Sequence, residues 1–287
     1  MVKFVILVFI SLSLLQTASA QKEKQPTGPL VTRTTTRHET YRLPFGGTVT
    51  LSGAPAGSIT IEGWQRNELE LTATIEIQAP SQADLDRIAP LNNLAVDVDV
   101  NHIRILTTGT HDRAFMKRVT KNFPKNLIGL PWKIDYLIKM PALTDLSVDA
   151  GNGPVAISGV EGALRLNALS SKANLSLTGG LVSVTVQAGE LTLTIPARSW
   201  HGLGSEFRVA SGKLIVELVP GFSADINADV LRLGEIKVDY PELKPREGSS
   251  VSSKSIRARA SNGGATLNFT VGDGAIEIKQ KAVGSKQ

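Results

Sequence analysis

Three consecutive segments of the chain share an 18-residue repeat, which constrains the fold more than any other feature. They begin at residues 146, 164 and 182 and read LSVDAGNGPVAISGVEGA, LRLNALSSKANLSLTGGL and VSVTVQAGELTLTIPARS. The residues between the apolar positions are mostly Ser, Thr, Asn, Lys and Asp, so each repeat is predicted to hold two short strands with one apolar face. Aligned, the repeats place apolar residues in shared columns, among them Leu146–Leu164–Val182 and Ile157–Leu175–Leu193.

Three looser copies of the pattern follow toward the C-terminus. They read FRVASGKLIVELV, INADVLRLGEIKV and IRARASNGGATLNFTV, and the last copy places Ala265, Leu267 and Phe269 after its turn. One repeat buries little by itself, whereas repeats stacked about 4.8 Å apart bury equivalent side chains in continuous columns. We therefore expect about six copies to rest on one another in chain order.

These observations predict an all-β fold, a right-handed parallel β-helix (β-solenoid). Parallel stacking pairs the backbone groups of each repeat with those of its neighbours, and right-handed coiling is the usual outcome for such crossovers. The turns GNG, AGE, SGK and NGG contain glycine, which tolerates the positive φ that a corner requires. An antiparallel β-sandwich has no reason to keep a constant register, and a β-propeller needs roughly 40 residues per blade.

Two segments depart from the strand pattern. In PSQADLDRIAPLNN, Ser81 and Asp84 have the spacing of a helix start and Pro90 discourages continuation, which predicts one short helix near residues 82–89. Residues 111–125 form a basic insert, either a surface excursion or a short amphipathic helix followed by a loop. Its cations are candidate contacts for an anionic glycan or a lipid head group: Arg113, Lys117, Arg118, Lys121 and Lys125.

The N-terminal residues predict export. Lys3 precedes an apolar run from Phe4 to Leu15, which is shorter than the roughly 20 residues of a membrane span, and small residues follow up to Ala20. The mature chain is expected to be periplasmic, cell-surface associated or extracellular, with no transmembrane segment. The expected divisions are a signal peptide cleaved after Ala20 (1–20), a flexible leader (21–43), a β-solenoid domain (44–280) and a polar tail (281–287).

The composition excludes several classes of chemistry. The chain contains no cysteine, so thiol catalysis and cysteine–zinc sites are ruled out, and the core rather than disulfides must hold the fold. The formal charge of +5 is mild and the cations are spread along the chain, which does not match a nucleic-acid-binding surface. No cofactor is expected.

The segments GSITIEGWQRNELELTATIEI, YLIKMPALTDLSVDAGNGPVAISGVEGAL, LTLTIPARS and GFSADINAD resemble the bacterial putative-adhesin family, also called the β-strand-repeat family. The similarity covers about residues 47 to 279. It implies a right-handed single-stranded β-helix and brings no catalytic residues, because none is assigned in the family. The chain departs from the family pattern at LNALSSKANLS, where the glycine–asparagine turn is missing, and in the basic insert.

The outer positions of the repeat do not gather a catalytic set. Asp149 aligns with Asn167 and Thr185, and Glu190 aligns with Lys172. Acid–base catalysis on a glycan requires two or more acids, or acids with Lys or Arg, on one face of adjacent coils. The carboxylates are therefore interpreted as solvated surface groups.

Histidines and tryptophans give no clearer site. The four histidines, at positions 38, 102, 111 and 201, lack metal-ligand spacing, and Asp97 and Asp99 near His102 are interpreted as a solvated strand face rather than a metal site. Trp64, Trp132 and Trp200 are interpreted as caps at the ends or corners of the core, with sugar stacking as the alternative.

The sequence thus favours an exported, non-catalytic β-solenoid that serves as an adhesin-like surface or envelope interaction module. Its partner would be an envelope glycan, an anionic surface or another envelope protein, and not nucleic acid. Two alternatives stay open: a carbohydrate-active β-helix enzyme, and an envelope scaffold that polymerises end to end.

Overall fold

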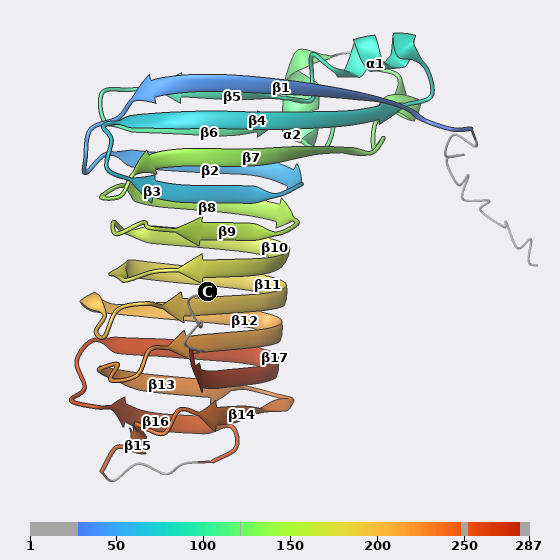
Figure 1. The fold of residues 1–287 in the computed structure, drawn as a ribbon. Helices are drawn as coiled ribbons and strands as arrows, with labels where there is room; N and C mark the ends of the chain where they lie inside the picture. The colour runs from blue at the N-terminus through green and yellow to red at the C-terminus, as the bar shows by residue number, and fades with distance from the viewer. Residues whose placement is uncertain (1–27, 121, 248–251, 282–287) are drawn as a thin grey trace, which may run out of the picture.

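The computed structural model describes residues 28–120, 122–247 and 252–281. The expected signal peptide with its cleavage residue Ala20, the cation Lys121 and residues 282–287 of the expected tail lie outside them. Within the described residues, seventeen strands form one sheet that is folded into a column, with two short α-helices at one end (Figure 1). The predicted all-β class is confirmed.

The repeating unit of the column is a rung with two arms that meet at a corner. Neighbouring rungs pair in parallel from β2 and β3 down to β12. In the upper rungs each arm is a separate strand: β2 (Thr48–Ala56) with β3 (Ile59–Trp64), and β8 (Asp145–Asn152) with β9 (Val155–Ser158). In the middle rungs one strand forms both arms: β10 (Leu164–Ser176), β11 (Gly179–Ile195) and β12 (His201–Leu218).

Alternating side chains from both arms fill the core of the column. The pairing register confirms two predicted columns, Leu146–Leu164–Val182 and Ile157–Leu175–Leu193. All six side chains are at most 2% exposed. Burial of this aliphatic surface is the main stabilising contribution to a fold that has no disulfides.

The rungs do not follow chain order at the C-terminal end. The last strand, β17 (Thr266–Gln280), lies between β12 and the rung formed by β13 (Ala224–Val230) and β14 (Gly234–Asp239). Two further strands cover this end: β16 (Ser255–Ala260) runs antiparallel to β13, and β15 (Leu243–Pro245) runs antiparallel to β16. The expectation of stacking in chain order is therefore wrong for the last copies.

The predicted alignment of the last copy is also wrong. Phe269 lies beside Phe207 in the first arm, not in the second arm where the sequence alignment places it. Both arms have the same alternation of apolar and polar residues. The periodicity therefore predicts which side chains are buried, but not which arm or which neighbour a strand takes.

A strand that the sequence pattern did not predict covers the N-terminal end. Residues 31–42, expected to belong to a flexible leader, form β1 (Val31–Arg42), which pairs antiparallel along its length with β4 (Glu68–Ala79). In turn, β4 pairs antiparallel with β7 (Trp132–Pro141). Most side chains of β1 are exposed, so its sequence carries no apolar period, and its pairing with β4 and its strand-favouring threonines hold it in place.

At the same end, a hairpin covers the first arm, which β2 forms in the upper rung. It consists of β5 (Asn93–Val98) and β6 (His102–Thr108), and β6 pairs in parallel with β2. Arg37 on β1 links the two arms, because its Nη1 donates to the Leu94 carbonyl oxygen at 2.8 Å and to the Asn93 side-chain oxygen at 2.9 Å.

Both helices lie in an overhang beside the column, which we define as residues 80–92 and 109–131 (Figure 1). The predicted first helix is confirmed as α1 (Gln82–Ile88), and its Ser81 cap accepts a hydrogen bond from the Asp84 amide. The basic insert forms α2 (Arg113–Val119) and a 3-10 turn (Lys125–Leu127), so the interpretation as a short helix followed by a loop is correct. None of the helices described here is long and apolar enough to span a membrane.

Glycines occupy one corner of nearly every rung. A Cβ on Gly212, whose φ is +137°, would lie 1.8 Å from the carbonyl oxygen of Gly189 in the neighbouring rung, so a side chain does not fit. Ser171 takes this position in the segment that lacks the glycine–asparagine turn, and its hydroxyl is buried with no hydrogen-bond partner among the described residues. The aligned residues are Gly57, Gly153, Ser171, Gly189, Gly212, Gly274 and Gly234.

Ile157→Asp tests the column assignment. The substitution places a charge without a partner inside the aliphatic core, and we expect it to lower the free energy of unfolding by roughly 4 kcal/mol or more. Asp149→Ala, on the exposed face of the same rung, should leave the melting temperature nearly unchanged. Equal melting temperatures for the two variants would contradict the assignment.

Gly212→Ala tests the packing of the corner. Gly129 serves as the matched control, because its φ is also positive (+83°) but a Cβ there would meet nothing within 4 Å. Gly129→Ala should therefore carry only backbone strain, about 1 to 3 kcal/mol. We expect Gly212→Ala to melt well below Gly129→Ala, since it adds a backbone clash, and similar melting curves would show that the rungs can move apart at the corner.

Candidate interaction surface

A groove of about 510 Å³ lies where the overhang meets the corner of the upper rungs. Its floor comes from small residues and backbone: Ala54 and Pro55 on β2, and Ala150 and Gly151 on β8. Gly151 lets β8 approach β2 closely at this floor, because a Cβ there would lie 2.2 Å from the Pro55 carbonyl oxygen. In the next rung, Leu169 of β10 stands 60% exposed and forms a wall.

Polar side chains line the groove above this floor. The Asp149 Oδ1 accepts a hydrogen bond of 2.8 Å from the Asn167 amide, and Gln187 follows on β11. Asp149 and Asn167 are aligned across the rungs, as the sequence register predicts. A carboxylate and two primary amides therefore offer donors and acceptors along one strip of the corner.

His111 closes the groove from the overhang. Its Nε2 lies 3.0 Å from the Gly53 carbonyl oxygen. Because a carbonyl can only accept, Nε2 carries the proton, and Nδ1 of the neutral ring is left as an acceptor. The ring lies 5.2 Å from that of Trp132, and desolvation in this setting lowers the pKa of His111.

The basic insert continues directly from His111. Asp112 caps α2 by accepting hydrogen bonds from the Phe115 and Ala114 amides, and these bonds hold the pKa of its carboxyl below the usual range. Met116 is the buried residue of the helix. Three predicted cations, Arg113, Lys117 and Arg118, are exposed on α2, and a fourth, Lys125, is exposed at the start of the 3-10 turn that follows.

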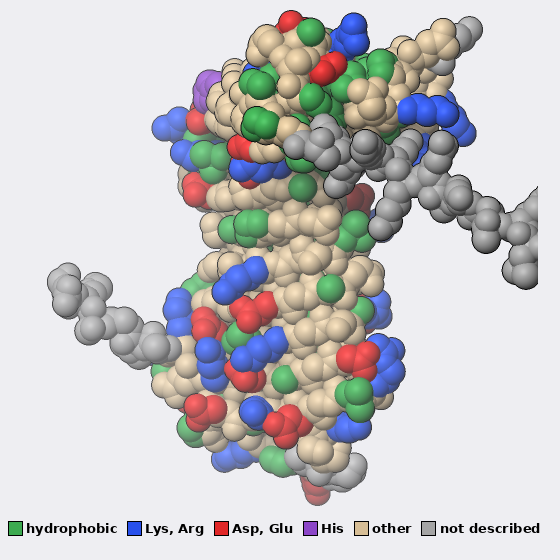
Figure 2. All heavy atoms as spheres, turned by 90° about the vertical axis from the view of Figure 1, so that its right-hand side faces the viewer, with side chains coloured by type: hydrophobic (Ala, Val, Ile, Leu, Met, Phe, Trp, Pro, Cys, Tyr) green, Lys and Arg blue, Asp and Glu red, His purple; other side chains and the backbone are tan. Residues whose placement is uncertain are grey.

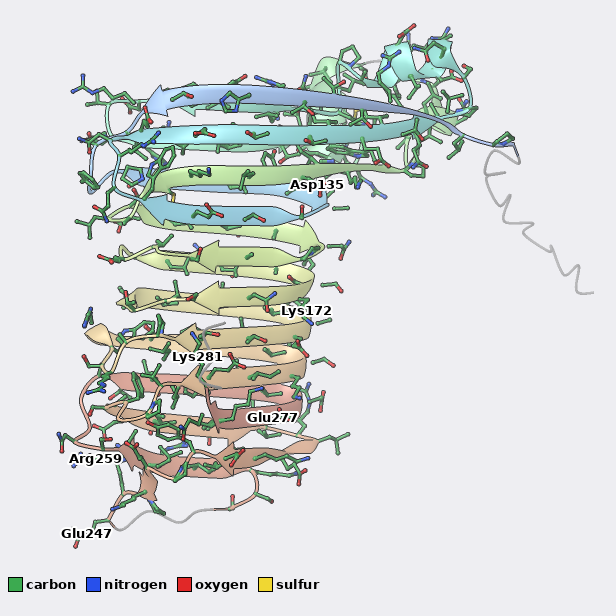
Figure 3. All side chains as sticks on the ribbon, in the orientation of Figure 1. Asp135, Lys172, Glu247, Arg259, Glu277 and Lys281 are labelled. Atoms are coloured by element: carbon green, nitrogen blue, oxygen red, sulfur yellow. The ribbon has the colours of Figure 1, made fainter. Side chains whose placement is uncertain are left out.

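These four cations differ from those on the column. In the described residues, none of the four lies within salt-bridge distance of a carboxylate. On the outer face of the second arm, by contrast, three lysines pair with glutamates of adjacent rungs. Figure 3 labels Lys172 and Glu277, which belong to two of these pairs. Figure 2 shows both charges interspersed over the lower part of the column. The pairs are Lys172–Glu190 at 3.5 Å, Lys213–Glu277 at 2.9 Å and Lys279–Glu217 at 3.3 Å.

The remaining sequence candidates have structural partners. Asp97 pairs with Arg104 at 2.6 Å, and His102 contacts the Thr50 hydroxyl at 2.9 Å. Over the ranges that the structure describes, no group of three His, Cys, Asp or Glu could hold a metal ion. Trp200 is 5% exposed and donates to the Gly180 carbonyl oxygen, in keeping with a role in the core, while the Arg66 guanidinium lies 4.8 Å from the ring centre of Trp64.

Several solved structures align with most of this chain. A putative cell adhesion protein from Clostridium sporogenes is 12% identical over 86% of this chain and 100% of its own, with a TM-score of 0.44. A putative adhesin from Bacteroides fragilis is 14% identical over 90% and 100%, with a TM-score of 0.32. A putative lipid binding protein from Parabacteroides distasonis is 12% identical over 86% and 97%, with a TM-score of 0.23.

Two of these three are described as adhesion proteins, the class that the sequence resembles. At such identities and TM-scores the likeness carries no argument about activity. No protein-family model and no curated protein matches the sequence.

The pKa of His111 predicts a pH dependence. The fold holds this pKa below its ordinary value of 6.5, so the unfolded chain takes up the proton at a higher pH than the folded chain. Stability contributed by the neutral ring is present above about pH 6.5 and is lost as the pH falls toward the folded-state pKa. His111→Gln keeps an amide donor for Gly53 but does not titrate.

The melting temperature of the wild type, measured relative to that of His111→Gln, should therefore decrease as the pH is lowered from about 7.5 to about 5.5. A constant difference across this range would show that His111 does not contribute to the pH dependence of folding.

Proposed function

We propose that this chain is an exported, non-catalytic β-solenoid with right-handed coiling, and that it binds acidic glycans of the cell envelope. The observation that carries the proposal is that His111 joins a polar groove to an insert whose four described cations form no ion pair with a described carboxylate. The groove would take a sugar ring, and the insert would take the carboxylate, sulfate or phosphate groups of neighbouring sugars.

The chemistry of the groove supports a sugar. Its volume falls within the usual range of small-ligand sites, about 300 to 1,000 Å³. Asp149, Asn167 and Gln187 can accept from and donate to ring hydroxyls, and the small apolar floor can contact the face of the ring. Strands of the stacked column, rather than loops, carry these three side chains, which favours a pre-formed site.

The unpaired cations support an anionic ligand. An ion pair within the protein would have to be broken before a cation could bind elsewhere, whereas the insert presents its charge directly to solvent. Such a cluster raises the local concentration of anions and speeds their association. Arginines in the cluster can also bind carboxylate or phosphate groups through two parallel hydrogen bonds.

Two alternatives have less support. Glycoside hydrolysis normally uses two carboxylates, and among the described residues that line the groove only Asp149 provides one. An end-to-end polymer would need open edges at both ends of the column. Charged side chains on the end strands oppose such pairing. At one end, β1 pairs with β4 and carries Arg33, Arg37 and Arg42. At the other end, Arg257 and Arg259 of β16 form ion pairs with Asp229 and Asp225 of β13.

Charge neutralisation in the insert tests the proposal. The probe is a polyuronic acid, compared with a neutral dextran of equal length, and binding is measured by calorimetry on the chain from residue 21. We expect Arg113→Gln, Lys117→Gln and Arg118→Gln together to weaken binding about tenfold or more and to reduce its dependence on salt. Asp149→Ala should weaken binding as well, without a change in melting temperature.

The matched control removes the same number of charges from the column. Lys172→Gln, Lys213→Gln and Lys279→Gln together lower the net charge equally, but take away cations that are already paired. Their effect on binding should be small. Equal losses in the two triple variants would mean that only net charge matters, and equal binding of polyuronic acid and dextran would overturn the proposal.

A further inference from the structure

The position of β17 divides the column into two parts that meet at one seam. The final five strands form a C-terminal module, residues 224–280: β13 lies between β16 and β17, and β14 pairs with β17. This module contacts the body of the column through the seam between β12 and β17, which runs in parallel register from Gly204–Thr266 to Leu218–Gln280. The strands on the two sides of the seam are far apart in sequence.

The connection between the two parts belongs to the module. Residues 219–223 must pass from the end of β12 to β13, which lies two rungs away. The Tyr240 hydroxyl donates to the Val219 carbonyl oxygen at 2.9 Å and accepts from the Phe222 amide at 3.0 Å, and the Glu242 Oε1 accepts from the Gly221 amide at 3.0 Å. Its last residue also contacts the body, because the Ser223 amide donates to the Arg198 carbonyl oxygen at 2.8 Å. If the connection moves with the module, this contact is exchanged as well, and the chain pivots ahead of Val219, near Leu218.

Side-chain contacts across the seam restrict which strand can pair with β12. The rings of Phe207 and Phe269 stack with centroids 5.6 Å apart. On the second arm, Lys213 pairs with Glu277 and Glu217 pairs with Lys279. A strand that replaces β17 against β12 must match this order of apolar, glycine and charged positions, and a second copy of this chain provides the same strand.

We propose that the C-terminal module is exchanged between two copies of the chain, so that β17 of each copy pairs with β12 of the other. Every contact within the module and within the body is kept in such a dimer, and the seam becomes intermolecular together with the contact of Ser223 to Arg198. Short connecting segments favour this kind of exchange, because the separated parts regain the same contacts without the constraint of the connection.

Engineered cysteine pairs distinguish the two arrangements, because the chain has no cysteine of its own. Arg208 and Thr270 are register partners across the seam. Neighbouring strands lie about 4.8 Å apart, within the Cα separation of a disulfide. The double variant with Arg208→Cys and Thr270→Cys is refolded at a series of protein concentrations. It is then oxidised and analysed by non-reducing electrophoresis.

We expect covalent dimers whose share rises with the protein concentration during refolding. The matched control is Arg165→Cys with Ser183→Cys, which are register partners of β10 and β11 within the body. These should link within one chain at every concentration. A second seam pair, Ile215→Cys with Glu277→Cys, repeats the test on the other arm if the first variant does not fold.

Covalent monomer alone at every concentration, from a seam pair that has folded and oxidised, would overturn the proposal. Equal dimer yields from the seam and control pairs would overturn it too, because they would reflect random oxidation. Insertion of four Gly and Ser residues after Leu218 should lower the dimer yield, since a longer connection lets the module close on its own β12.

Discussion

Close contact between backbones at the corner of each rung is the constraint on which the structure depends. The hydrogen bonds between rungs fix their spacing at about 4.8 Å, and at this spacing a Cβ on the positive-φ corner glycines would clash with the backbone of the neighbouring rung; Ser171 is the one aligned residue that has a side chain. Glycine at the corner lets the chain turn without moving the rungs apart. The two arms can then keep one register through many rungs, and the inner side chains come into contact in columns that need no disulfide.

The same regularity explains what could and could not be predicted from the sequence. The columns through Leu146 and Ile157 were predictable, because a slip of one residue would turn a buried face toward solvent. The place of β17 was not, since both arms show the same alternation and Phe269 fits either. The strand β1 was not predicted, because backbone pairing with β4, rather than burial of an apolar face, holds it in place.

The candidate site shows a similar division. Its cations were visible as a charge cluster between Arg113 and Lys125, and the register predicted that Asp149 and Asn167 would be neighbours. The groove itself could not be predicted, because Gly151 and Gln187 approach His111 only once the overhang lies over the corner. Three lysines on the second arm are paired with glutamates of a neighbouring rung, whereas the four described cations of the insert have no carboxylate within ion-pair distance and face solvent.

The inserted position of β17 has a consequence for the order of folding. This strand comes last among the described strands but occupies an interior layer of the column, so these strands cannot be stacked progressively from one end to the other as the chain is made. Until the final fifteen residues of β17 arrive, β12 and the rung of β13 and β14 each lack a neighbour on one side. A truncation that removed part of β17 would therefore damage an interior layer of the column rather than its tip.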